Sequence, residues 1–222
     1  MNHPRTTPRP LLLGHRGARA LKSIPENTVA SFDRALADGC DGFEFDVRLT
    51  ADGKPVVGHE PQINGIEIAQ SPVERLTALP QLQNVLSRYR ECAFLDIELK
   101  VHGLEKITVD LLRKYPPRHG CVVSSFLPEV LQAMHAENPG IPLGLICETI
   151  AQLRAWSRLP VEYVIPHYKL VDEALIGQFK DTGKKILVWT VNAPADMQRF
   201  VKCGVDGIIS DNTSLLCRTV TA

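Results

Sequence analysis

The chain has 222 residues, and its 25 basic and 25 acidic side chains leave a formal net charge of zero. This length suits one domain with a full core, and the hydrophobic share of 44% is ordinary for a globular protein. The balanced charge gives no sign of a nucleic-acid or anionic membrane partner, and no window approaches the roughly 18 apolar residues of a membrane span, so we expect a soluble cytoplasmic protein with no stable membrane insertion.

The predicted elements follow a polar, proline-rich stretch, MNHPRTTPRP, at residues 1–10, which we expect to form a flexible N-terminal arm. Residues 11–222 are expected to form a single domain, in which apolar runs of strand length alternate with amphipathic, helix-like stretches. The apolar runs occupy residues 11–14, 42–49, 92–99, 121–125, 141–147, 162–166, 185–191 and 206–210. Such alternation predicts parallel strands joined by helical crossovers. Eight units of this kind favour a closed TIM (β/α)8 barrel over an open doubly wound sheet.

One segment, residues 50–78, departs from this alternation. It begins with a predicted turn at Asp52 and Gly53 and continues as an extended return and a loop, so the barrel should carry a short excursion after its second strand. Long loops in compact domains tend to be functional, and the loops that follow barrel strands lie on the face where active sites sit. We therefore expect the excursion to border the functional site.

Acidic side chains interrupt two of the predicted strands. Side chains alternate across a strand, so Glu44 and Asp46 share one face of the second run, opposite its Phe and Val residues. In the third run Asp96 and Glu98 share a face, and Lys100 continues it. If the apolar faces pack against the outer helices, both sets of acids point into the barrel near its carboxyl end.

Several carboxylates in one cavity repel one another unless a cation joins them. A hard divalent ion with oxygen ligands, such as Mg²⁺ or Ca²⁺, is one solution. A buried ion-pair network with Arg16, Arg48 or Lys100 is the alternative, and alternation along the strands does not decide between the two.

Two histidines fall near the same end of the barrel. His15 ends the first strand in GHRGA, and His59 lies in the excursion in VVGHE. Imidazoles titrate near neutral pH, so the pair could act as general acid and base. The guanidinium group of Arg16 can donate paired hydrogen bonds to phosphate oxygens, and the carboxylate of Glu26 is its alternative partner. Together with a divalent ion, these groups indicate hydrolysis of a phosphate ester.

The order of short motifs along the chain resembles the glycerophosphodiester phosphodiesterase family. The matching blocks are GHRGA, PENT at 25–28, EFDVRLTADGKPVVGHE, DIELK, SSF at 124–126, VWTVN at 188–192 and GVDGIISD at 204–211. The resemblance spans residues 11–211 and implies a TIM barrel, in agreement with the strand count. It also implies hydrolysis of glycerophosphodiesters, which are small molecules, to sn-glycerol 3-phosphate and an alcohol.

The resemblance assigns the residues nearest the chemistry. It implies that Glu44, Asp46 and Glu98 bind one divalent cation, Mg²⁺ or Ca²⁺. It implies that His15 and His59 are the general base and the general acid, in an order that the sequence does not decide. The implied route is attack by the glycerol 2-hydroxyl, which gives a cyclic phosphate that water then opens.

Further residues match positions around the substrate. The resemblance implies that Arg16 and Lys100 contact the phosphate. Trp189 matches an aromatic residue beside the substrate-binding mouth, and packing at the barrel rim would explain it almost as well. Glu26 and Asn27 match positions that brace the first loop.

The sequence also departs from the family pattern. Glu60 stands where an Asp usually follows the histidine that matches His59, and the segment after Glu60 is compact. The sequence therefore does not decide which alcohol the protein prefers. Asp211 ends the last strand and is expected to support Arg16 or a neighbouring group. A lysophospholipase D-like or other phosphodiesterase on the same scaffold is the alternative function, and a catalytically silent phosphate-binding protein is a further one. The sequence does not indicate the oligomeric state.

Overall fold

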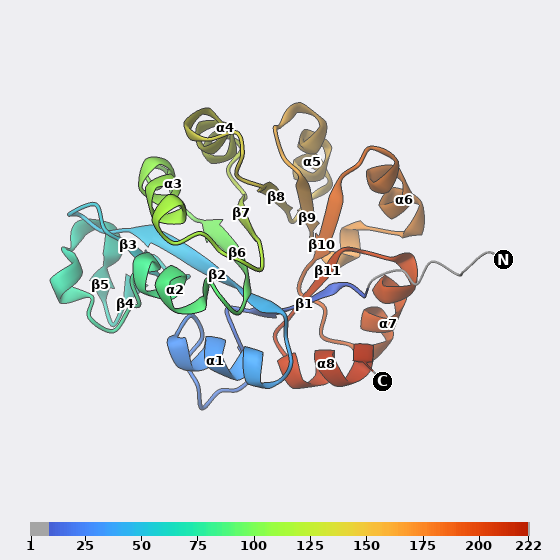
Figure 1. Ribbon diagram of the computed structural model, residues 1–222, viewed down its shortest axis with the longest axis horizontal. Helices are drawn as coiled ribbons and strands as arrows, with labels where there is room; N and C mark the ends of the chain where they lie inside the picture. Colours follow the sequence, from blue (N-terminus) through green and yellow to red (C-terminus); the bar gives the residue numbers. More distant parts are fainter. Residues whose placement is uncertain (1–8, 222) are drawn as a thin grey trace.

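A computed structural model describes residues 9–221 of the chain (Figure 1). Most of the predicted N-terminal arm, residues 1–8, lies outside the described residues. Arg9 and Pro10 are described: Arg9 Nη1 lies 2.6 Å from Asp41 Oδ2, and Pro10 is buried. These two residues, which the sequence assigned to the arm, therefore lie against the barrel domain.

Eight parallel strands close into a barrel in the described part of the chain. They are β1 (Leu11–His15), β2 (Gly42–Leu49), β6 (Phe94–Leu99), β7 (Cys121–Ser125), β8 (Leu143–Cys147), β9 (Tyr163–Pro166), β10 (Lys185–Val188) and β11 (Gly207–Ser210). Their order is β1-β11-β10-β9-β8-β7-β6-β2, and β1 also pairs with β2, which closes the ring. In Figure 1 the blue first strand lies beside the red last strand. The predicted TIM barrel and its eight strands are confirmed.

Helices connect the strands and surround the barrel (Figure 1). They are α1 (Val29–Ala37), α2 (Leu82–Tyr89), α3 (Glu105–Lys114), α4 (Pro128–Glu137), α5 (Ile150–Leu153), α6 (Glu173–Asp181), α7 (Pro194–Cys203) and α8 (Thr213–Thr221). The local sequence sets their ends: Thr28 caps α1 by accepting a hydrogen bond from the Ser31 N–H, and Gly204 ends α7 with φ +69°. The helix α5 is a single turn, continued by a 3₁₀ segment over Arg154–Arg158.

The two faces of each strand divide the apolar side chains into an outer and an inner core. Phe43 and Phe45 of β2 point outward, where Phe43 stacks on Phe32 of α1 with ring centroids 4.2 Å apart. A smaller cluster inside the barrel contains Leu13 and Phe94. The alternation predicted for β2 and β6 is confirmed, because their acidic side chains share the inner face with Phe94.

The excursion after β2 forms a small lobe beside the barrel. It contains β3 (Pro55–Val57), antiparallel to β2, the hairpin strands β4 (Gln62–Ile63) and β5 (Ile66–Glu67), and two 3₁₀ turns, Ile68–Gln70 and Val73–Arg75. The predicted turn at Asp52 and Gly53 is present, since the Gly53 N–H donates to the Thr50 carbonyl. A separate apolar cluster of Val56, Ile68 and Leu76 holds the lobe together.

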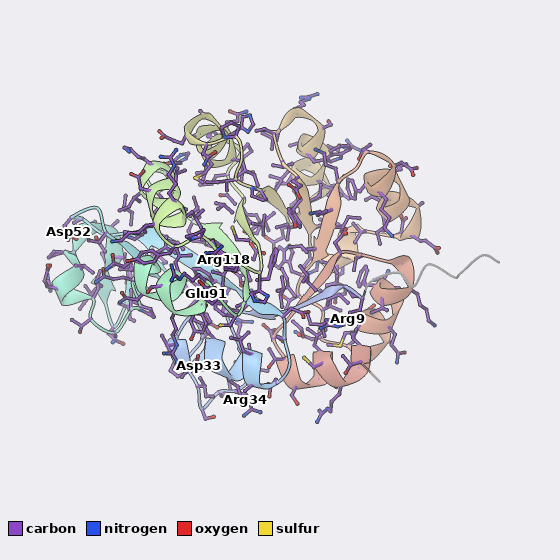
Figure 2. The ribbon with its side chains drawn as sticks, in the orientation of Figure 1. Arg9, Asp33, Arg34, Asp52, Glu91 and Arg118 are labelled. Carbon is purple, nitrogen blue, oxygen red and sulfur yellow. The ribbon has the colours of Figure 1, made fainter. Side chains whose placement is uncertain are left out.

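The outer surface carries ion pairs between exposed side chains (Figure 2). Asp33 lies 2.8 Å from Arg88, and Glu91 lies 3.8 Å from Arg118. Exposed pairs of this kind contribute about 1 kcal/mol or less each. Among residues 9–221, Ile150 is the only large apolar side chain that is mostly exposed, at 49%. The same residues contain no helix with the length and apolar character needed to cross a bilayer.

Gly42 tests how tightly β2 and β6 pack. A Cβ at this position would lie 1.8 Å from the Phe94 carbonyl oxygen, so Gly42→Ala should destabilise the protein by about 3 kcal/mol. Gly177 is the matched control: it lies within α6 with open space around it, so Gly177→Ala should stabilise by about 1 kcal/mol. Urea unfolding followed by circular dichroism measures both, and equal stability of the two variants would contradict the packing argument.

Candidate active site

A cavity of about 340 Å³ opens at the carboxyl end of the barrel strands. Its lining includes most of the residues predicted for the site, from four strands and the excursion: His15, Arg16, Glu44, His59, Glu98, Lys100 and Trp189. The location is the usual one for the active site of a TIM barrel. The prediction that the excursion borders the site is confirmed, because it supplies His59.

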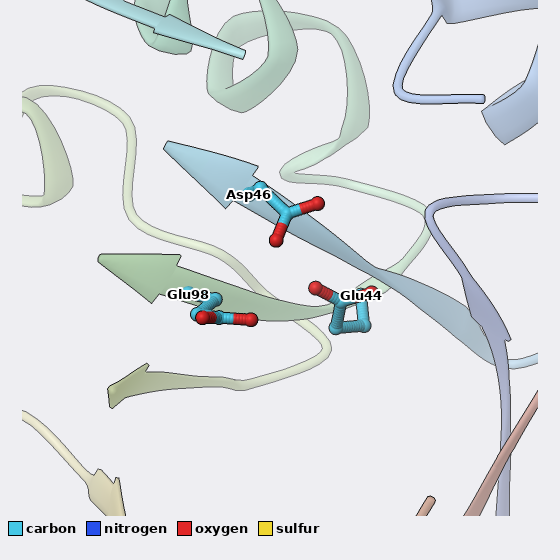
Figure 3. A group of neighbouring side chains, drawn as sticks. All are labelled: Glu44, Asp46 and Glu98. Atoms are coloured by element: carbon cyan, nitrogen blue, oxygen red, sulfur yellow. The ribbon is translucent and has the colours of Figure 1, made fainter. Parts of the chain in front are cut away.

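Three carboxylates converge beside this cavity (Figure 3). Glu44 and Asp46 come from β2 and Glu98 from β6, where Asp46 is directly paired with Glu98. One oxygen from each lies within 4.8 Å of one oxygen from each of the others, and all three side chains are buried. Within the described residues, Glu44 Oε1 and Asp46 Oδ1 have no hydrogen-bond partner. A cluster of hard oxygen donors with unpartnered buried atoms fits a divalent cation such as Mg²⁺ or Ca²⁺.

Basic side chains also contact the acids. Lys100 Nζ lies 2.7 Å from Glu98 Oε1 and 3.3 Å from Asp46 Oδ1, and Arg16 Nε lies 3.3 Å from Asp46 Oδ2. Of the three basic residues considered for an ion-pair network, Arg16 and Lys100 therefore contact the acids. Arg48 takes no part in it and instead donates from Nε to the His59 carbonyl. Two positively charged side chains do not neutralise three ionised carboxylates, so the ion pairs leave a negative charge that a metal ion can balance.

The mutual repulsion of the acids appears in their pKa values. Burial raises the pKa of Glu98 to about 7, with Asp46 adding to the rise and Lys100 opposing it. Burial and the neighbouring carboxylates raise the pKa of Glu44 well above its usual value. Burial also acts to raise the pKa of Asp46, but Lys100 and Arg16 outweigh it and lower that pKa. Asp46 therefore holds the negative charge most firmly, and a bound cation would favour the ionised form of all three.

A fourth acid, Asp96, lies deeper in the barrel. It is paired with Glu44 across β2 and β6, and it accepts a hydrogen bond from the Ser124 hydroxyl at 2.5 Å. Its other oxygen has no partner among the described residues, and burial raises its pKa to about 7. Asp96 adds a negative charge below the three converging carboxylates at high pH.

The stability of the metal-free protein should therefore depend on pH. Folding raises the pKa of Asp96 from 3.8 to about 7, so the folded state binds the proton more tightly, and stability is lost as pH rises between these two values. Asp96→Asn keeps the acceptor for Ser124, and it should stabilise the protein at pH 8 by about 1–3 kcal/mol more than at pH 5. Urea unfolding in EDTA at both pH values measures this, and the exposed Glu74→Gln serves as control. An equal effect of Asp96→Asn at the two pH values would contradict it.

His15 is held at the end of β1 by the last strand. Its Nδ1 lies 2.7 Å from Asp211 Oδ1, and its Nε2 lies 3.9 Å from Glu44 Oε2. Burial lowers the pKa of His15 more than Asp211 raises it. Asp211 also contacts Asn192 at 2.8 Å and Arg19 at 3.3 Å. Asp211 thus contacts His15, which is one of the groups next to Arg16 that the sequence prediction had allowed.

His59 lies in the loop that follows β3. Its Nδ1 is 2.7 Å from Glu60 Oε1, and its backbone carbonyl accepts the hydrogen bond from Arg48. The Glu60 side chain is 73% exposed, so this pair is open to solvent, unlike the pair of His15 and Asp211, whose side chains are 11% and 17% exposed. In both histidines Nδ1 is engaged and Nε2 remains for a ligand.

The loop between β1 and α1 is folded tightly around the acids. Arg16 has φ +51° and Asn27 φ +58°, values that are uncommon for residues other than glycine. The Arg16 N–H donates to Glu44 Oε2, and Asn27 Nδ2 donates to Asp46 Oδ2 at 2.8 Å. Glu26 holds Arg16 from the other side, with Oε1 2.7 Å from Arg16 Nη1. Both predicted bracing residues therefore lie against the site.

Two glycines let this loop pack closely against itself and against α1. A Cβ on Gly17 would lie 2.3 Å from Ser31 Oγ, and one on Gly14 would lie 2.5 Å from the Gly17 carbonyl oxygen. Larger residues at these positions would therefore displace the loop that carries Arg16.

Aromatic side chains also border the cavity. Trp189 follows β10, lines the cavity and donates from Nε1 to the Ile165 carbonyl at 2.9 Å. It packs edge-on against Phe126 and His167, with ring centroids 5.8 and 5.3 Å away. Both explanations offered for Trp189, a cavity wall and a packing residue, thus describe part of its surroundings.

Some residues of the cavity were not predicted. Phe126, Glu148 and Ile146 line it, and each continues the inward face of its strand at intervals of two residues. The alternation used for β2 and β6 would have found them if it had been extended through β7 and β8. Arg19, which contacts Glu26 at 2.7 Å, gave no comparable signal because it lies in a loop.

A closed α/β barrel whose cavity combines converging acids, two histidines and two cations belongs to the class of phosphate-ester hydrolases. The chain belongs to the glycerophosphoryl diester phosphodiesterase family, whose model matches residues 15–215. The protein is thus a phosphoric diester hydrolase.

Comparison with known proteins supports this assignment along the whole domain. The chain is 30% identical to a glycerophosphodiester phosphodiesterase of Caldanaerobacter subterraneus, with 95% of this chain and 97% of the relative covered. It is also similar to a phosphodiesterase of Oleispira antarctica solved in complex with the product sn-glycerol 3-phosphate, at 25% identity, a TM-score of 0.84 and coverage of 96% and 98%. A glycerophosphodiester phosphodiesterase of Thermotoga maritima shares the fold, at 24% identity, a TM-score of 0.81 and coverage of 98% and 99%.

Proposed function

We propose that the protein hydrolyses glycerophosphodiesters to sn-glycerol 3-phosphate and an alcohol, with one divalent cation and two histidines. The observation that carries the proposal is the convergence of Glu44, Asp46 and Glu98 beside a cavity that both His15 and His59 line. The similarity to a phosphodiesterase solved with sn-glycerol 3-phosphate supports the choice of product.

In the proposed mechanism, His15 acts as the general base. Its Nδ1 is directed at the half-buried Asp211 carboxylate, which favours the tautomer with the proton on Nδ1 and leaves the Nε2 lone pair to accept a proton. It would take the proton of the attacking hydroxyl, which is the glycerol 2-hydroxyl if the reaction passes through a cyclic phosphate. Asp211 then stabilises the imidazolium that forms.

His59 is the proposed general acid. With Nδ1 against the Glu60 carboxylate, a protonated His59 can donate from Nε2 to the oxygen of the leaving alcohol. The longer side chain of Glu60 still reaches Nδ1, so the replacement of the usual Asp does not remove this support. The solvent-open position of the pair suits release of an alcohol.

The phosphate would lie between these histidines, against the cations. Arg16 and Lys100 both line the cavity and can neutralise its non-bridging oxygens. Glu44, Asp46 and Glu98 would hold the divalent cation, which when bound supplies Lewis-acid polarisation of the phosphoryl group. In the structure Lys100 contacts Glu98 and Asp46. A metal ion held by those acids would replace these contacts, and the ammonium group of Lys100 could then contact the phosphate.

A direct assay tests the proposal. The purified protein is incubated with glycerophosphocholine, and sn-glycerol 3-phosphate is measured with Mg²⁺, with Ca²⁺ and after treatment with EDTA. We expect release with at least one of the two ions, loss of release in EDTA, and recovery when that ion is returned. A protein that releases no sn-glycerol 3-phosphate from any glycerophosphodiester with either ion would refute the proposed function.

The exposure of the apolar side chains and the residues in the cavity bear on the alternative functions. A lysophospholipase D-like enzyme would meet its substrate at a membrane, and an exposed apolar rim would favour that activity. Within residues 60–80 the large apolar side chains are buried or half-buried, with Ile68 and Leu76 at 2% and 1% exposure. A soluble substrate is therefore favoured. A silent phosphate-binding protein is disfavoured because both histidines and all three acids of the site are in place.

A further inference from the structure

A second cavity, of about 360 Å³, lies next to the first and shares His59 with it. It lies between the loop at residues 25–28 and the excursion. Its apolar wall is formed by Ile63 and Ile68 of the excursion and by Leu79, which follows directly after it. Because His59 lines both spaces, an alcohol that receives its proton from His59 leaves the phosphate beside a residue that also borders the second cavity. Nothing in the proposed chemistry at the phosphate uses this space.

The charges that line the two cavities differ. The first contains Arg16 and Lys100, whereas none of the described residues that line the second is a lysine or an arginine. The second contains the carboxylates of Glu26 and Glu60. Both oxygens of Glu26 are engaged by arginines at 2.7 Å, through Arg16 and Arg19. Glu60 uses Oε1 for His59 and is 73% exposed, so its second oxygen can face a ligand.

We propose that the second cavity binds the leaving alcohol and favours an alcohol with an alkylated ammonium group. This inference rests on the proposed function and specifies its substrate. The ammonium charge would lie near Glu60, while its methyl groups pack on Ile63, Ile68 and Leu79. The volume is at the small end of the roughly 300–1,000 Å³ range of ligand pockets, which suits a short amino alcohol better than a lipid chain.

The test compares two substrates that share the glycerophosphate half. Glycerophosphocholine carries a cationic leaving alcohol, and glycerophosphoglycerol carries a neutral one of similar length. For the wild-type protein we expect kcat/KM to be about fivefold or more higher for glycerophosphocholine, the size of effect that one charge gives across a solvated pocket. A ratio near one in the wild-type protein would overturn the inference while leaving the proposed function intact.

A positive charge introduced on the wall of the second cavity provides a second test. Ala78 lines the cavity and is exposed, so its replacement should not affect folding. Ala78→Lys should lower the ratio of kcat/KM for glycerophosphocholine to that for glycerophosphoglycerol by about fivefold. Ala78→Gln is the matched neutral control and should keep the wild-type ratio. If Ala78→Lys and Ala78→Gln give the same ratio, the alcohol does not occupy this cavity.

Glu60→Gln separates the two roles of that side chain. Loss of support for His59 should lower turnover on both substrates, and loss of the charge should in addition lower the ratio of glycerophosphocholine to glycerophosphoglycerol. A fall in turnover with an unchanged ratio would contradict recognition of the ammonium group by Glu60. If the wild-type protein, with metal, cleaves neither substrate, the proposed function fails, and this inference fails with it.

Discussion

Replacement of His15 by alanine is expected to lower kcat by a factor on the order of 10² to 10⁴, at saturating metal and without unfolding the barrel. The imidazole is 9% exposed and is fixed between Asp211 and Glu44, so no neighbouring side chain can move into its place. Release of sn-glycerol 3-phosphate from glycerophosphocholine measures the effect. A rate within tenfold of the wild-type value would refute the role of general base.

The control for this substitution is His135→Ala, which removes an exposed imidazole from α4 that does not line the cavity. It should keep full activity. Thermal unfolding of the three proteins shows whether a loss of activity reflects a loss of fold. Partial recovery of the His15→Ala rate by added imidazole would further support proton transfer at this position.

The two histidines can be told apart by the leaving group. His59→Ala should also lower kcat on glycerophosphocholine by about 10² to 10⁴, because choline leaves poorly without a proton. On a p-nitrophenyl phosphodiester, whose phenolate leaves without protonation, His59→Ala should lose much less, whereas His15→Ala should lose as much as before. Equal losses on both substrates for both variants would contradict the assignment of base and acid.

Glu44→Gln should weaken the binding of the divalent cation by about 10²-fold or more. The substitution keeps the shape of the side chain but removes one of three converging carboxylates, and even residues that only support metal ligands are worth about 10- to 100-fold in affinity. Calorimetric titration with Mg²⁺ and with Ca²⁺ measures the change. The variant should recover part of its activity at high metal concentration.

The matched control is Glu148→Gln. Glu148 lines the same cavity but is exposed and lies outside the three converging acids, so its loss should leave the metal affinity within about threefold of the wild type. An unchanged affinity in Glu44→Gln would favour the alternative of an ion-pair network without a metal.

The fold was predictable because its signals are local and repeated. Each barrel strand is short and almost fully buried, so each appears as an apolar run, and helices of about two to three turns fill most of the gaps. The same two-residue period placed Glu44, Asp46 and Glu98 inside the barrel, since a strand that is paired on both sides leaves its side chains only two directions. The single-turn α5 shows the limit, because a helix of four residues has no detectable period.

The remainder of the site depends on chain segments that have no period. The left-handed backbone at Arg16 and Asn27 and the contacts of Glu26 with two arginines arise from one tight loop. Likewise, the pairing of Asp211 with His15 joins residues 196 positions apart, which no local pattern reveals. The residue types and the resemblance to a family pointed to these residues, and the contact of Arg16 with Glu26 was among the alternatives, but the structure was needed to show that Asp211 contacts His15.

The pair of His15 and Asp211 also ties the onset of activity to the completion of folding. The acids and both histidines lie within the first hundred residues, but Asp211 arrives with β11, which must insert beside β1 to seal the ring. A nascent chain on the ribosome can therefore assemble the acids well before its catalytic imidazole is aligned. In refolding experiments, enzyme turnover should consequently return with the slowest step that closes the seam, after most secondary structure has formed.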